Sequence, residues 1–116
     1  HEHCAQADAS AVSGLDQHHR EKMEGIADRI RESPGATPAV ADLARSAGYS
    51  VDHFSRVFCR VMGERPQAYV IRCKMERACA LLAETGMAVG MVADALGFSD
   101  IFYFSRLFRE KLGVSP

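Results

Sequence analysis

The chain has 116 residues, enough for one modest domain or for one domain with a tail. Its hydrophobic fraction of 47% and charged fraction of 25% are ordinary for a globular protein. The sequence contains no apolar run of 18 or more residues and no signal-peptide pattern, so it indicates neither a membrane span nor export. We therefore expect a cytoplasmic protein. The formal net charge is −1, which does not by itself favour a nucleic-acid partner. Clustering of arginines matters more, because phosphate attraction is local at physiological ionic strength.

The first segment, residues 1–17, shows no sustained hydrophobic period and is rich in Ala, Ser and Gln, which predicts a linker or disordered tail. It contains His1, His3 and Cys4, but short clusters of this kind are more often adventitious than metal sites. The cysteine spacings match no zinc motif and no obvious disulfide framework. We therefore expect neither a metal nor another cofactor, and the role of these three residues stays open.

Apolar residues recur at helical spacing from residue 18 onward, and nothing reads as a strand, so we predict an all-α fold. In the second helix Thr37 and Pro38 are expected to serve as cap and first-turn proline. Gly48 ends that helix, and Ser50 is expected to cap the next one. The expected helices cover residues 18–33, 38–47, 51–62, 66–84, 88–96 and a last segment through 104–112.

One supersecondary unit occurs twice in the chain. The segment 44–50, ARSAGYS, returns as 93–99, ADALGFS, and 54–58, FSRVF, returns as 104–108, FSRLF, with one extra residue between the halves of the second copy. Each copy reads as helix, glycine turn and helix, the layout of a helix-turn-helix DNA reader. This predicts a first unit over 18–65, a connecting helix over 66–84 and a second unit over 85–116.

In each copy, the exposed face of the second helix of the unit carries a serine and an arginine at the same helical positions. Arginine can donate two hydrogen bonds to guanine, and serine can reach a base or a phosphate. Aspartate can accept a hydrogen bond from cytosine N4, and Ile101 and Phe102 could touch a thymine methyl group. The first-turn amides of each helix are expected to be free donors for a phosphate. A solvated helix face is the alternative, but repetition in one register favours DNA contact. The face of the first copy comprises Asp52, Ser55, Arg56, Cys59 and Arg60, and that of the second comprises Ile101, Phe102, Ser105, Arg106 and Arg109.

The spacing of the two copies fits a duplex. A helix over 66–84 would be about 28 Å long, whereas successive major-groove faces on one side of B-DNA lie about 34 Å apart. A stiff connector of that length could place two reading helices in adjacent major-groove segments. We expect the two units to be unequal readers of an asymmetric site.

With these features the sequence resembles the DNA-binding domain of AraC/XylS-family bacterial transcription regulators, over roughly residues 19–116. The most specific match is the second copy, from Ala93 through Arg109, followed by Gly113-Val114-Ser115-Pro116. The resemblance implies about seven helices in two homeodomain-like helix-turn-helix units, with the third and sixth helices reading DNA.

The same resemblance implies the residues that bind DNA and the partners. Base-reading positions would fall on Asp52, Ser55 and Arg56 and on Ile101, Phe102, Ser105 and Arg106, with phosphate contacts on Arg60 and Arg109. The implied function is a sequence-specific promoter-binding regulator, commonly an activator, that works with RNA polymerase and carries an effector-binding or dimerisation domain elsewhere. We therefore expect this chain to be a piece of a longer protein, with its second unit cut short at the C-terminus.

Two departures from the family pattern lead to further expectations. Cys59 stands where the second copy has Arg109, so the first unit is expected to lose a phosphate contact. Ala88 stands at a position usually held by a Ser or Thr cap, and Gly90 follows in the first turn, so this helix start is expected to fray more than the one near Thr37.

Two other functions compete with DNA reading. A helical interaction module could dock RNA polymerase with only minor DNA contact; a linear fall of log affinity with log salt separates the two. An enzyme or alkyl-transfer sensor would need a reactive cysteine. Only Cys4 precedes the domain and no four-ligand zinc set exists, so we expect no enzyme.

Overall fold

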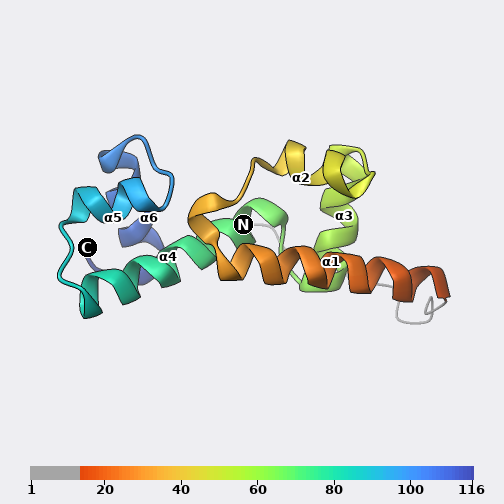
Figure 1. Cartoon of the computed structure of the whole chain (residues 1–116), viewed down its shortest axis with the longest axis horizontal. Helices are drawn as coiled ribbons and strands as arrows, with labels where there is room; N and C mark the ends of the chain where they lie inside the picture. The colour runs from red at the N-terminus through yellow and green to blue at the C-terminus, as the bar shows by residue number, and fades with distance from the viewer. Residues whose placement is uncertain (1–13) are drawn as a thin grey trace.

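The computed structural model describes residues 14–116, which form six α-helices and one short 3₁₀ helix without any strand (Figure 1). This confirms the all-α prediction. The elements are α1 (Gly14–Glu32), η2 (Pro34–Ala36), α2 (Val40–Ala47), α3 (Val51–Met62), α4 (Pro66–Glu84), α5 (Val89–Ala95) and α6 (Ile101–Leu112). No helix of this described part is long and apolar enough to cross a membrane.

Two helix starts differ from their predicted places. Helix α1 begins at Gly14, so residues 14–17 belong to it and not to the predicted linker; the apolar period starts late, but Gln17 already donates to Glu21 one turn on (3.1 Å). Helix α2 begins at Val40 and its N-cap is Ala39, without a side-chain hydrogen bond. The Thr37 hydroxyl instead donates to the Ser33 carbonyl oxygen (3.2 Å), so Thr37 does not cap α2 as expected.

The first hydrophobic core lies between α1, α2, α3 and the first half of α4. Its centre includes Met23, Phe54 and Phe58, all fully buried. Tyr69 of α4 closes this core, and its hydroxyl accepts a hydrogen bond from Arg31 of α1 (2.6 Å). Burial raises the pKa of Tyr69. The apolar residues of the repeated segment 54–58 therefore form the inner face of α3.

A second core lies between the rest of α4, α5 and α6. It includes Met75, Val92 and Phe104, each no more than 1% exposed. Helix α4 thus contributes one end to each core and connects the two halves of an elongated molecule, 48 × 26 × 23 Å (Figure 1). The connecting helix is both a spacer and a shared part of the two packed units.

Candidate nucleic-acid interface

Each half contains a helical hairpin with the same turn. Gly48 and Gly97 both adopt the left-handed conformation, with φ of 84° and 85°, which glycine reaches at little cost. The residue after each glycine donates its backbone N–H to the carbonyl oxygen of Ala44 or Ala93, at 2.9 Å in both copies. These two alanines are 0% and 2% exposed. The glycine turns are thus confirmed in both copies, and the small buried alanines let two helices meet closely there.

The two predicted reading helices are capped by different residues. Ser50 caps α3 as expected, because its hydroxyl oxygen accepts from the His53 backbone N–H (3.1 Å). In α6 the cap is Asp100, whose carboxylate accepts from the N–H groups of Phe102 (2.9 Å) and Tyr103 (3.4 Å). The extra residue of the second copy moves the cap one position along the chain. The expectation of free first-turn amides is wrong for these three N–H groups, because the caps already occupy them.

In the first unit the structure brings Asp52 and Arg56 together. They form an ion pair one turn apart (2.6 Å), and both side chains are largely exposed. Ser55 is half-buried, and Arg60 is exposed in the last turn of α3. Cys59 is buried, so its predicted place on the exposed face is wrong. Helix α3 packs against both α1 and α4, which gives it a wider buried arc than a single stripe.

In the second unit the same register carries an arginine without a carboxylate partner. The Arg106 guanidinium lies over the Tyr103 ring, 5.3 Å from its centre. Within residues 14–116 no ion pair involves Arg106 or Arg109, which are both exposed. Ser105 is half-buried. The most exposed side chains at the start of this helix are apolar, with Phe102 80% and Ile101 39% exposed.

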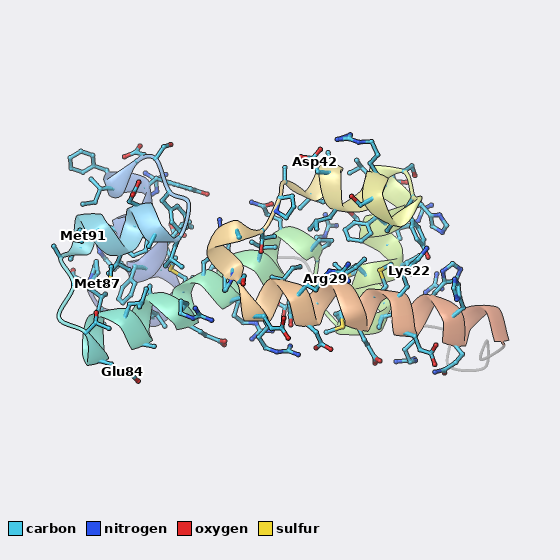
Figure 2. The ribbon with its side chains drawn as sticks, viewed as in Figure 1. Lys22, Arg29, Asp42, Glu84, Met87 and Met91 are labelled. Atoms are coloured by element: carbon cyan, nitrogen blue, oxygen red, sulfur yellow. The ribbon has the colours of Figure 1, made fainter. Side chains whose placement is uncertain are left out.

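A cluster of three aromatic rings and one lysine supports the start of α3. No motif in the sequence predicts this cluster. His19 of α1 hydrogen-bonds to the Tyr49 hydroxyl, and the His53 ring lies 5.0 Å from the Tyr49 ring. Lys22 lies on α1 beneath the hairpin (Figure 2), where its Nζ donates to the Ala47 carbonyl oxygen at the end of α2 (2.8 Å). Burial raises the pKa of Tyr49. The hydrogen bonds that join α1 to the hairpin in this cluster span 25 and 30 positions of the sequence, so no local pattern could have revealed them.

Among the described residues no group of three or more His, Cys, Asp or Glu is arranged to hold a metal ion. His1, His3 and Cys4 lie outside the described residues.

The two halves touch directly as well as through α4. Gly35 of η2 lies so close to the end of α5 that a Cβ there would be 2.4 Å from the Ala95 carbonyl oxygen. Near this contact the Lys74 ammonium lies 5.0 Å from the centre of the Phe98 ring, and burial lowers the pKa of Lys74. Arg77 of α4 also donates to the Glu32 carbonyl oxygen at the end of α1 (3.2 Å). These contacts restrain the position of one hairpin relative to the other.

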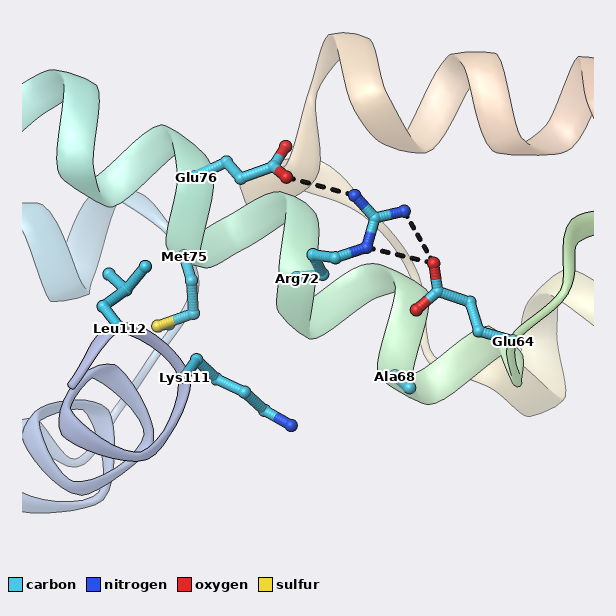
Figure 3. Close-up of a pocket in the computed structure, with 7 residues that line it drawn as sticks. All are labelled: Glu64, Ala68, Arg72, Met75, Glu76, Lys111 and Leu112. Carbon is cyan, nitrogen blue, oxygen red and sulfur yellow. Dashed lines mark hydrogen bonds and ion pairs between the residues drawn. The ribbon is translucent and has the colours of Figure 1, made fainter. Parts of the chain in front are cut away.

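A groove of about 290 Å³ lies between α4 and the end of α6 (Figure 3). Arg72 lines it on the α4 side and pairs with Glu64 (2.6 Å) and Glu76 (3.1 Å), which raises the pKa of Arg72. None of the residues predicted to bind DNA lines the groove, so it is separate from the two reading faces.

Comparisons with known proteins agree with the architecture. A family model described as a helix-turn-helix domain matches residues 43–116. The transcriptional activator NphR of Rhodococcus is 31% identical over 107 residues, which cover 91% of this chain and 32% of NphR. The chain spans about a third of the length of the curated relatives it matches.

Two solved structures have the same fold. The DNA-binding domain of AdpA, a global transcriptional factor solved in complex with a target DNA, is 27% identical with a TM-score of 0.76, over 82% of this chain and 86% of that one. An AraC-type DNA-binding domain-containing regulator from Chromobacterium violaceum gives a TM-score of 0.74 at 23% identity, over 86% and 89%. Together with the duplicated hairpins, these matches show that the chain belongs to the AraC-type helix-turn-helix family of DNA-binding transcription regulators.

Proposed function

We propose that the chain binds promoter DNA sequence-specifically by placing α3 and α6 in two adjacent major-groove segments, and that the protein containing it activates transcription in the cytoplasm together with RNA polymerase. The observation that carries this proposal is the repeated pair Ser55-Arg56 and Ser105-Arg106, at one register on two exposed helix faces. The DNA complex of AdpA supports DNA binding, and the activator NphR supports the sign of regulation.

The geometry of the connector supports binding to two segments. Helix α4 has 19 residues, about 28 Å at 1.5 Å per residue, and the Gly35 contact restrains the hairpins further. In the view of Figure 1 both α3 and α6 begin at the upper edge of the molecule. Two readers on one edge can face one side of a duplex, where major-groove segments recur about every 34 Å.

We assign different tasks to the reading residues. Arg56 and Arg106 would donate to guanine O6 and N7, and Asp52 would accept from cytosine N4. Arg60 and Arg109, at the last turns of their helices, would contact phosphates. Asp52 competes for Arg56, whereas Arg106 has no carboxylate partner among residues 14–116, so the second unit would make the firmer contact.

We also propose the division of the chain and its place in a longer protein. The two hydrophobic cores support a first unit over 18–65, a connecting helix over 66–84 and a second unit over 85–116. Because the relatives are about three times as long, the effector-binding or dimerisation domain would lie in the remaining part of the protein.

Selection of bound sites from random duplexes tests the proposal directly. The expected result is an asymmetric consensus with two separate conserved segments, and an affinity whose logarithm falls linearly with log salt concentration. No enrichment, together with binding that salt does not affect, would contradict DNA reading and favour a protein-docking module.

A further inference from the structure

The first turn of α6 presents apolar side chains to solvent, and that of Phe102 is the most exposed. Phe102 is 80% exposed and Ile101 is 39% exposed, although both belong to the helix proposed to enter the major groove. At the equivalent places α3 has Asp52 and Val51. The two readers therefore differ most in chemistry at the turn that would approach the bases first.

The backbone of Phe102 is anchored at the start of α6. Its backbone N–H is bound by the Asp100 cap, and Ile101 lies against the start of α5, where a Cβ on Gly90 would be 3.6 Å from the Ile101 Cδ1 atom. Phe102 and Arg106 are four residues apart, so their side chains are neighbours on one helix face, with Cβ atoms about 5–6 Å apart. Arg106 is itself stacked on Tyr103.

Only one kind of base group in the major groove matches an exposed apolar ring. Thymine carries a methyl group at C5, whereas the other edges present hydrogen-bond donors and acceptors. A cytosine methylated at C5 carries the same apolar group. Burying Phe102 against either methyl group removes apolar surface from water, which is favourable. An unmethylated cytosine has only a hydrogen atom at C5, so the same contact removes less apolar surface.

We propose that α6 selects a pyrimidine with a 5-methyl group, thymine or 5-methylcytosine, through Phe102. Base pairs are about 3.4 Å apart along a strand, so the spacing of Phe102 and Arg106 places this pyrimidine within about two steps of the guanine read by Arg106. This inference rests on the proposed DNA-reading function and adds the chemical identity of one recognised group.

The test uses the duplex obtained by site selection and replaces each thymine singly by deoxyuridine, which removes only the methyl group. At one or two positions in the segment bound by α6, the dissociation constant is expected to rise about fourfold per methyl group removed. At the same position, a 5-methylcytosine–guanine pair is expected to bind about fourfold more tightly than a cytosine–guanine pair.

Two variants separate methyl recognition from other roles of the helix. Phe102→Ala should bind the thymine and deoxyuridine duplexes equally, and its thermal unfolding midpoint should match that of the parent chain because the ring is exposed. Val51→Ala removes an apolar first-turn side chain from α3, 49% exposed, and should leave the thymine–deoxyuridine difference at the α6 segment intact.

Three results would overturn the inference while leaving DNA reading in place. They are a specific site without thymine in the α6 segment, deoxyuridine substitutions that change nothing there, or a methyl preference that Phe102→Ala retains. Failure to select any specific duplex would instead contradict the proposed function itself.

Discussion

Replacing Asp52 by alanine should loosen the specificity of the first reading helix while barely affecting the fold. The Asp52–Arg56 pair is exposed, with 79% and 65% of the side chains accessible, and such pairs contribute about 0.3–0.5 kcal/mol. Loss of an acidic residue from the first turn of α3 adds about 0.3–1 kcal/mol. The free energy of unfolding should therefore fall by about 1 kcal/mol. On DNA the same change releases Arg56 and removes a charge that repels phosphates.

The dependence of DNA affinity on salt concentration measures the charge of Arg56 that Asp52→Ala releases. One additional phosphate contact steepens the slope of log affinity against log salt by about 0.9, so the change from 50 to 200 mM salt should weaken non-specific binding about 3- to 4-fold more for Asp52→Ala than for the parent chain. Fluorescence anisotropy with a random duplex gives both slopes. Asp28→Ala on α1 removes the same charge from a similar exposed pair with Arg31 and serves as the control. Equal slopes for both variants would refute the idea that Asp52 restrains Arg56.

Three further substitutions, with Gly25→Ala as a control, test the second reader, the packing of the two halves and the start of α5. Arg106→Ala should weaken binding to the selected site by roughly 1–3 kcal/mol in a competition assay; an equal loss on random duplexes would mean that the arginine reads no base. Gly35→Ala should lower the thermal unfolding midpoint because its Cβ would lie 2.4 Å from the Ala95 carbonyl oxygen. The control Gly25→Ala, whose Cβ would have nothing within 4 Å, should instead stabilise α1 by roughly 0.5–1 kcal/mol. Shifts of the midpoint in the same direction for both variants would contradict a tight contact between the two halves. Gly90→Ala should slow amide exchange at the start of α5 by stabilising it roughly 0.5–1 kcal/mol; unchanged exchange would show that glycine is not what weakens this start.

The fold was largely predictable because its turns and cores depend on local, repeated signals. Ala44, Gly48 and their copies mark the hairpins through residue size and backbone conformation, which are properties of single positions. The helix starts were less predictable. Both α2 and α5 begin on an alanine without a side-chain cap, so the expected contrast in fraying now depends on Gly90 alone.

The candidate site was predictable where it follows helical spacing and unpredictable where it depends on distant contacts. The Asp52–Arg56 pair lies at i, i+4, a spacing that could have indicated it in advance. The cap at Asp100 depends on how the chain absorbs one extra residue. The contact of Gly35 with Ala95 joins residues 60 positions apart in the sequence, and nothing in either local pattern indicates it.

The way α4 divides its buried side chains has a consequence for local opening. Tyr69 and Cys73 belong to the first core, Met75 and Ala78 belong to the second, and Lys74 lies between them. Each core can therefore lose its packing without directly removing buried side chains from the other. Amide hydrogens should accordingly fall into two cooperative groups that exchange with different free energies of opening. Under the proposed binding to two DNA segments, such a domain would release one segment while the other stays bound.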